Sequence, residues 1–225
     1  MRVCCLFSGG KDSSYSLHRM LLSGFEVPVL LTVRSSDPDS WLYQTPGIEI
    51  SHLFPDLTGI ETEILDSPAD RDREREVLTA RLIDMKERFR LDAVCTGALL
   101  SDYQRMIFSH AAFDAGLISY TPIWRKDGIG YLNDLVGSGF EFILLSYSSE
   151  GFDPGDLGRI VDDEMKERFL DIAERWRSHP AFEGGEAETL VLSAPLYRKR
   201  LEIRGEVRIE SEFRARYMIR EARCV

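Results

Sequence analysis

Six consecutive residues near the start of the chain combine the side-chain and backbone types that bind phosphate. Ser8-Gly9-Gly10-Lys11-Asp12-Ser13 follows a short apolar run and precedes a segment with helical periodicity. Paired glycines let the backbone turn tightly and bring successive N–H groups close to an oxyanion, while a helix N-terminus adds donors and partial positive charge. The spacing is neither GxxxxGK[ST] nor GxGxxG. We predict a phosphate-binding loop here, with an ordinary helix-capping turn as the alternative.

The segments around this loop alternate between strand and helix patterns. Strands are expected at 3–7, 27–33, 60–65 and 92–96, helices at 12–23 and 101–115, and extended chain at 118–124. A further helix is indicated by an apolar stripe of Leu78, Leu82, Met85 and Phe89. Alternating strands and helices imply an α/β fold with a parallel sheet covered on both faces.

The second half of the chain has a different pattern. A strand is expected at 140–147, a helix along the stripe from Val161 to Trp176, and strands at 188–193, 198–204, 206–209 and 213–219, with Gly205 at a turn. We place a domain boundary near 124–130. This divides the chain into a domain with the predicted phosphate-binding loop, 1–127, and a smaller α+β domain, 128–225.

An acidic, glycine-containing string lies in the second half of the chain. It reads Glu183-Gly184-Gly185-Glu186-Ala187-Glu188-Thr189-Leu190 and follows His179-Pro180. Three carboxylates around a glycine pair suit a cation or a cationic substrate, and a solvated acidic turn is equally compatible with the pattern.

The composition of the chain limits which binding partners and which cellular compartment are expected. Lys and Arg total 28 against 38 Asp and Glu, a net charge of -10, so the surface as a whole should repel nucleic acid. Four cysteines without CxxC spacing indicate reduced thiols and a cytoplasmic protein, and four scattered histidines show no metal-ligand spacing. The apolar run at 3–7 is too short for a signal peptide or a membrane span.

The phosphate-binding loop resembles the SGGxDS signature of the PP-loop superfamily, the N-type ATP pyrophosphatases. That resemblance implies a Rossmann-like fold of the adenine nucleotide alpha hydrolase type, and cleavage of ATP to AMP and pyrophosphate. It also implies that Lys11 offsets phosphate charge and that Asp12 places Mg²⁺ or caps the helix. The residues that would cradle the pyrophosphate are Ser8, Gly9, Gly10, Ser13 and Ser14.

The acidic string resembles the hallmark of a single family, the diphthine-ammonia ligases, also called diphthamide synthetases. Further matches are Trp41 to Pro46, Gly97 to Arg105, Pro122 to Trp124, Glu150-Gly151 and Leu157 to Arg159. The family resemblance implies that the carboxylate of diphthine on translation elongation factor 2 is amidated with ammonium and ATP, through an acyl adenylate. Two positions depart from the family pattern: Ala181-Phe182 stands where a smaller pair is expected, and Arg125 where glycine is common.

Diphthine carries a trimethylammonium group, which carboxylates and aromatic rings attract. We therefore predict that diphthine is bound by Glu183, Glu186 and Glu188 together with Tyr43, Tyr103 or Trp124. Gly184, Gly185 and Thr189 of the same string, and Gln104 and Arg105 beside Tyr103, complete this predicted set. Catalytic roles are assigned to Lys11, Asp12 and Glu186. Adenine is expected near Thr32 and near Gly97-Ala98, because nucleotide sites in such sheets gather at the carboxyl ends of strands.

Two other functions are compatible with the loop. A PP-loop enzyme acting on tRNA would need a basic surface, and thiolating members often need paired cysteines, neither of which the sequence indicates. A nucleotide-binding sensor without turnover is the other alternative. The sequence has no glutaminase pattern, so free ammonium is the expected nitrogen source. A homodimer is compatible with the sequence.

Overall fold

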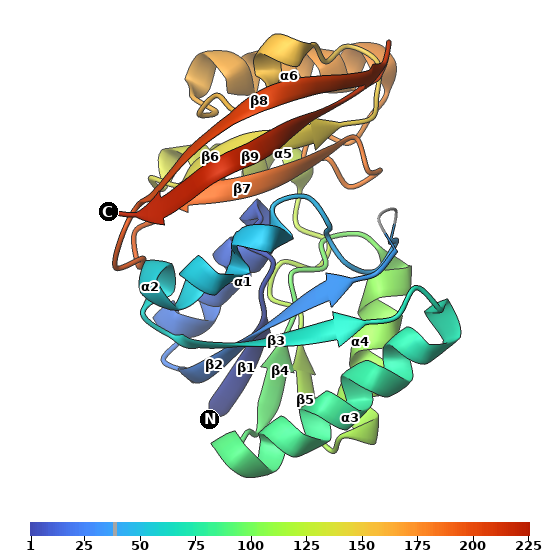
Figure 1. Ribbon diagram of the computed structural model, residues 1–225, viewed down its shortest axis with the longest axis vertical. Helices are drawn as coiled ribbons and strands as arrows, with labels where there is room; N and C mark the ends of the chain where they lie inside the picture. The colour runs from blue at the N-terminus through green and yellow to red at the C-terminus, as the bar shows by residue number, and fades with distance from the viewer. Residues whose placement is uncertain (38–39) are drawn as a thin grey trace. The chain divides into compact units, whose positions relative to one another are not determined.

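The computed structural model describes residues 1–37 and 40–225, which form two compact units (Figure 1). The first unit comprises Met1–Ser8, Asp12–Pro55 and Gly59–Arg125. The second comprises Gly9–Lys11, Asp56–Thr58 and Lys126–Val225. The division into domains 1–127 and 128–225 stays a prediction.

The first unit is built on the five-stranded parallel sheet that the sequence predicts. Its strands are β1 (Arg2–Leu6), β2 (Glu26–Ser35), β3 (Glu61–Ser67), β4 (Ala93–Cys95) and β5 (Ile118–Tyr120). They pair in the order β3-β2-β1-β4-β5, and every pair is parallel. The α/β fold class is therefore confirmed.

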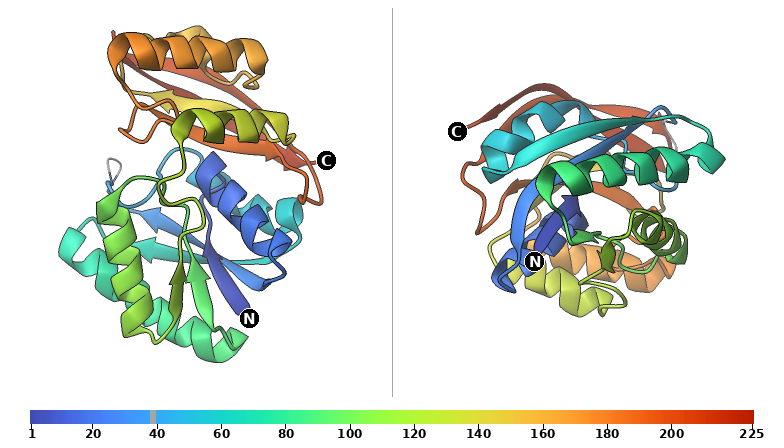
Figure 2. Two further views of the ribbon diagram at one scale, coloured as in Figure 1. Left: turned by 180° about the vertical axis from the view of Figure 1, so that it is seen from behind. Right: turned by 90° about the horizontal axis from the view of Figure 1, so that it is seen from below.

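Helices cover both faces of this sheet. Helices α3 (Arg71–Phe89) and α4 (Asp102–Asp114) pack against one face, and α1 (Lys11–Leu22) lies on the other (Figures 1 and 2). Two short elements between β2 and β3 were not predicted, the 3-10 helix η1 (Ile48–Leu53) and α2 (Phe54–Thr58). Among the described residues, no helix is both long and apolar enough to cross a membrane.

The core of the first unit follows the alternation of the strands. Cys4, Val29, Leu31 and Val94 are buried in one cluster on the face that meets α3 and α4. The predicted stripe of α3 enters the same cluster through Leu78, Leu82 and Met85. Apolar burial on both faces explains why these strands read as continuous hydrophobic runs.

The strand order creates a switch point beside β1. After β1 the chain moves outward through β2 to β3, and it then returns to the other side of β1 to form β4 and β5. Connections that leave neighbouring strands in opposite directions open a crevice at the carboxyl ends of those strands, where open α/β sheets bind ligands. The loops that follow β1 and β4 therefore lie where a ligand is expected.

The second unit has an antiparallel sheet with two helices. Its strands are β6 (Glu141–Tyr147), β7 (Ala187–Ser193), β8 (Leu201–Ser211) and β9 (Arg214–Cys224), in the order β7-β6-β9-β8. Helices α5 (Gly128–Gly137) and α6 (Asp163–Trp176) cover one face of the sheet (Figure 2), and the 3-10 turn η2 (Pro154–Asp156) precedes α6. The predicted α+β composition is confirmed, but α5 was not predicted.

The prediction of a turn at Gly205 is wrong. Gly205 lies inside β8, where the register with β9 shifts by a residue, and the strands are joined only after Ser211. A Cβ atom at this position would lie 2.3 Å from the Met218 carbonyl oxygen and 2.7 Å from the Tyr217 ring. Glycine is needed here because the neighbouring strand approaches too closely for a side chain.

Replacing Gly205 should therefore destabilise the second unit. We expect Gly205→Ala to lower the free energy of unfolding by about 1–3 kcal/mol, because the new methyl group overlaps backbone that has no room to move. Gly137→Ala is the matched control, since a Cβ there meets no heavy atom within 4 Å. Urea denaturation followed by circular dichroism measures both variants, and equal stability would contradict the structural reason given for Gly205.

Candidate functional site

The loop after β1 is closed by its own serines. The Ser8 amide donates to the Ser13 hydroxyl over 3.2 Å, and the two hydroxyl oxygens are also 3.2 Å apart. Gly9 has a φ of 80°, a conformation that favours glycine. The chain thus reverses direction within a few residues and enters α1 directly, as a phosphate-binding turn requires.

The loop after β4 touches the start of α1. A Cβ on Gly97 would lie 2.8 Å from the Ser13 amide nitrogen and 2.9 Å from the Asp12 carbonyl carbon. Glycine at 97 therefore allows the first turn of α1 to approach the end of β4. The structure brings together two segments that the sequence assigned separately to phosphate and adenine.

Three further residues of the predicted nucleotide set have definite places beside β1. Thr32 is fully buried, and its hydroxyl donates to the Phe7 carbonyl over 2.7 Å. Ser14 and Ala98 are buried in the packing around the loop. The contact made by Thr32 fixes the backbone that leads into the loop. Contact between Thr32 and adenine stays a prediction.

Sequence reasoning missed Gln44 as a site residue. Its side-chain oxygen accepts a hydrogen bond of 2.9 Å from the Ser8 hydroxyl, and its side-chain nitrogen donates to the Pro46 carbonyl. The segment after β2 is thereby attached to the phosphate-binding loop. Its place in the family string Trp41 to Pro46 was the signal that could have identified it.

Lys11 is almost completely buried although it carries a charge. Its amide donates to the Thr189 hydroxyl over 3.0 Å, and its ammonium lies 5.5 Å from the centre of the Phe182 ring. An ammonium over an aromatic face is attracted by the ring quadrupole. Phe182, which departs from the family pattern, thus provides an aromatic surface for the Lys11 ammonium. The role of Lys11 in offsetting phosphate charge stays a prediction.

The acidic string forms an ordered turn before β7. Both carboxylate oxygens of Glu186 accept backbone N–H groups, one from His179 at 2.8 Å and the other from Gly184 at 2.7 Å. Ser148 holds the same turn, since its hydroxyl donates to the Gly185 carbonyl and its amide to the Glu186 carbonyl. Glu186 is 9% exposed. Its carboxylate therefore organises the loop in this structure, and its predicted catalytic role is untested.

The other members of the string differ in exposure. Gly184 and Gly185 are exposed, Glu183 and Glu188 are half-buried, and Thr189 is buried. Glu188 lies in β7 opposite Ser146 of β6. Contact between these carboxylates and an acceptor remains a prediction.

The three aromatic residues assigned to the acceptor lie in different surroundings. Tyr43 is packed in the core of the first unit, 6.1 Å from the Phe108 ring, and burial raises the pKa of its hydroxyl. Tyr103 is 38% exposed at the first turn of α4. Trp124 already carries the guanidinium of Arg105 at 4.7 Å and that of Arg125 at 5.7 Å. Of the three rings, that of Tyr103 is the most open to a ligand.

Residues beside Tyr103 connect α4 to the neighbouring loops. Gln104 donates to the Leu42 carbonyl over 3.2 Å, and Ser101 caps α4 by accepting the Gln104 amide. Arg125 has a φ of 57°, in the left-handed region that favours glycine. Glycine would adopt this conformation without steric cost.

Asp12 is half-buried in the first turn of α1, where a carboxylate is favoured by the helix dipole. Among the side chains that the structure describes, no three from His, Cys, Asp or Glu cluster closely enough to hold a metal ion by themselves. A Mg²⁺ ion near Asp12 would therefore need oxygen ligands from a bound nucleotide, which is the usual arrangement for Mg²⁺.

Three buried groups around β1 have pKa values shifted in favour of their uncharged forms. Burial raises the pKa of the Cys4 thiol, and a hydrogen bond with Cys95 together with burial raises that of Cys5. Burial also lowers the pKa of His18, whose Nδ1 lies 2.8 Å from the Ser14 carbonyl oxygen. None of these three groups has the electrostatic environment of a nucleophile or a charged ligand.

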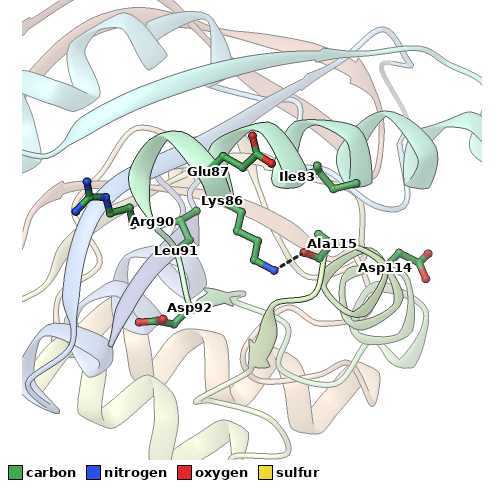
Figure 3. Close-up of a pocket in the computed structure, with 8 residues that line it drawn as sticks. All are labelled: Ile83, Lys86, Glu87, Arg90, Leu91, Asp92, Asp114 and Ala115. Carbon is green, nitrogen blue, oxygen red and sulfur yellow. Dashed lines mark hydrogen bonds between the residues drawn. The ribbon is translucent and has the colours of Figure 1, made fainter.

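A hollow of about 640 Å³ lies at the opposite edge of the parallel sheet (Figure 3). It is lined by the C-terminal ends of α3 and α4 and by Asp92, which precedes β4. The Lys86 ammonium donates to the Ala115 carbonyl over 3.1 Å and so completes the end of α4. This hollow adjoins the amino ends of the strands, so it is distinct from the phosphate-binding loop.

The close approach at Gly97 generates a prediction for ligand binding. We expect Gly97→Ala to weaken binding of an ATP analogue by at least about tenfold, or about 1.4 kcal/mol, because the methyl group displaces the first turn of α1. Calorimetric titration measures the affinity, and Gly137→Ala, which removes a glycine without a clash, is the control. Unchanged affinity in Gly97→Ala would show that this contact does not shape the ligand site.

Comparison with known proteins identifies the family. Residues 1–119 match the diphthamide synthase N-terminal domain and residues 127–225 match the diphthamide synthase C-terminal domain. A solved structure, described as a predicted subunit of tRNA methyltransferase from Methanocaldococcus jannaschii, is similar over 87% of this chain and 98% of its own, at 17% identity and a TM-score of 0.42. A similarity of that size adds nothing to the assignment.

Curated relatives carry one description, diphthine–ammonia ligase. The zebrafish relative (Danio rerio) is 32% identical over 89% of this chain and 86% of its own length. The fission yeast relative (Schizosaccharomyces pombe) is 35% identical over 89% of this chain, which spans only 36% of that longer protein, and the human relative is 28% identical over 82% of its length. The chain belongs to the diphthamide synthase family.

Proposed function

We propose that this protein is an ATP-dependent ligase that amidates the carboxylate of diphthine with ammonium and releases AMP and pyrophosphate. The observation that carries the proposal is the phosphate-binding loop at the switch point of the sheet, in a chain that matches both domains of the diphthamide synthase family. The curated relatives named diphthine–ammonia ligase support the same activity. Residues 1–127 would bind ATP, and residues 128–225 would carry the acidic string.

The first half-reaction would activate the acceptor. A carboxylate is a poor electrophile because its leaving group would be oxide. In the proposed step the carboxylate oxygen attacks the α-phosphorus of ATP, and the bond to the β-phosphate breaks, giving an acyl adenylate and pyrophosphate. Backbone N–H groups of the loop, with Lys11, would stabilise the charge that develops on pyrophosphate, a contribution that is usually the largest in such reactions.

Magnesium fits this arrangement only together with the nucleotide. Asp12 offers one carboxylate in the first turn of α1, and Mg²⁺ is commonly held by one or two carboxylates plus substrate phosphates. When bound, the ion would neutralise phosphate charge. We therefore keep Asp12 as the proposed protein ligand.

In the second half-reaction ammonia would attack the acyl carbon, and the bond to AMP would break to leave the amide. Free ammonium is the proposed source of nitrogen. Glutamine hydrolysis needs a cysteine that ionises readily, whereas the pKa values of Cys4 and Cys5 are raised by burial and by contact with Cys95.

The acceptor would be recognised through its trimethylammonium group. Tyr103 offers an accessible aromatic face, and Glu183 and Glu188 offer half-buried carboxylates. The protein partner would be translation elongation factor 2 carrying diphthine. Since that factor works at the ribosome, we also propose a cytoplasmic location.

Amidation of the factor tests the proposal directly. Purified protein is incubated with ATP, Mg²⁺, ammonium and elongation factor 2 bearing diphthine, and AMP, pyrophosphate and the mass of the factor are measured. We expect equal amounts of AMP and amidated factor. Lys11→Met should lower the rate by about 10²-fold or more, because a charge aimed at the phosphates is lost.

Arg75→Met is the control, since Arg75 is exposed on α3 and should leave the rate unchanged. AMP formation without a mass change would reject diphthine as the acceptor while keeping the ATP chemistry. Absence of both products would reject the ligase.

A further inference from the structure

The strand β8 forms an open edge of the antiparallel sheet. It stands last in the order of the described strands, so β9 pairs with only one of its two sides (Figure 1). The other side presents a row of backbone N–H and C=O groups, which is a template for pairing with another chain. The strand is 11 residues long and contains no proline that would interrupt such pairing.

Charged side chains alternate in sign along one face of β8. Successive side chains of a strand point to opposite faces, so every second residue shares a face. One face carries, in order, Glu202, Arg204, Glu206, Arg208 and Glu210, all of them exposed. Edge strands are commonly protected by charges that discourage pairing with another chain. A row that contains both signs in alternation can instead attract a second copy of itself.

This row is complementary to itself in the reverse direction. Two copies that pair antiparallel about a two-fold axis at Val207 place each residue opposite the one equally far beyond the axis. Glu206 then lies opposite Arg208 of the second copy, and Arg204 lies opposite Glu210 of the second copy. Each contact occurs twice by symmetry, and opposite charges directly across an antiparallel pair stabilise it. An axis at Glu206 would set Glu206 against itself and Arg204 against Arg208, so the charges select among the registers.

The other face of β8 favours an axis at Val207 over one at Gly205, which would also join opposite charges. Val207 is 38% exposed and Ile209 is 65% exposed, although both side chains are apolar. With the axis at Val207, the two Val207 side chains meet, and Ile209 lies opposite Gly205, which has no side chain to obstruct it. Pairing in this register therefore removes apolar surface from water as well as joining charges.

The arginines of the charged face are the residues that a second copy would satisfy. Among the described residues, neither Arg204 nor Arg208 forms an ion pair, whereas Glu206 pairs with Arg220 of β9. Arg208 lies opposite Arg216 in the ladder between β8 and β9, and like charges in that position repel each other. A carboxylate from a second copy would offset this repulsion.

We propose that two copies of this chain associate through their β8 strands, antiparallel about a two-fold axis at Val207, so that two four-stranded sheets become one continuous sheet. A single pair of strands covers less surface than a permanent dimer interface, so the association depends on protein concentration. It is a property of the second unit and is independent of the proposed ATP chemistry.

Sedimentation velocity of the full chain over about 1 to 200 µM measures the association. Arg208→Glu places a carboxylate opposite Glu206 at both symmetric contacts. Combining Arg208→Glu with Glu206→Arg exchanges the two charges and restores complementarity about Val207, whereas about Gly205 the same exchange sets like charges against each other. Arg175→Glu, at an exposed position of α6, is the control for the changed net charge. Circular dichroism checks that each variant is folded.

We expect the original protein to dimerise with a dissociation constant on the order of 10 µM, and Arg208→Glu to weaken the dimer by at least about tenfold. Arg175→Glu should change the dissociation constant by less than about twofold, and the double variant should return to within about threefold of the original. A monomer at every concentration, an equal effect of Arg208→Glu and Arg175→Glu, or no recovery in the folded double variant would overturn the proposal.

Discussion

The packing of the first turn of α1 against the backbone after β4 is the constraint on which the candidate site depends. Only glycine at 97 lets these two segments meet, since a Cβ would overlap the Ser13 amide and the Asp12 carbonyl carbon. The strand order makes the meeting possible by placing β4 beside β1. From this contact follow the direction of α1 and the place where we propose that an anion binds.

Hydrogen bonds within the loop and to β7 then determine what the loop can bind. Ser8 and Ser13 close the turn, and Gln44 attaches it to the segment after β2. Thr189 accepts the Lys11 amide, and the Val191 amide donates to the Gly9 carbonyl. Preorganisation of this kind is what allows a phosphate site to bind charge without rearranging at the moment of reaction.

The sequence predicted the parts of the fold that depend on local periodicity. The strand β1, the helix α1 and the stripe of α3 are continuous patterns, so they could be recognised along the chain. Helix α5 was missed because Gly128, Gly130 and Gly137 resemble loop residues, although Tyr131, Leu132 and Leu135 form its buried face. Gly205 was misassigned because glycine marks close backbone approach as well as turns.

Contacts between residues far apart in sequence could not be predicted in this way. The bond from Lys11 to Thr189 joins positions 178 residues apart, and no local pattern signals it. The sequence assigned a catalytic role to Glu186, which stays a prediction, and its carboxylate accepts backbone amides of its own turn. The family resemblance identified the family, and only the structure assigned each side chain to its contacts.

The central claim is that the loop after β1 holds the β and γ phosphates of ATP. A crystal structure of the protein with α,β-methylene ATP and Mg²⁺ tests it most directly. The account predicts that oxygens of these two phosphates accept hydrogen bonds from backbone N–H groups between Gly9 and Ser14, with adenine beside Gly97 and Ala98. Phosphates bound elsewhere, with no contact to these amides, would contradict it.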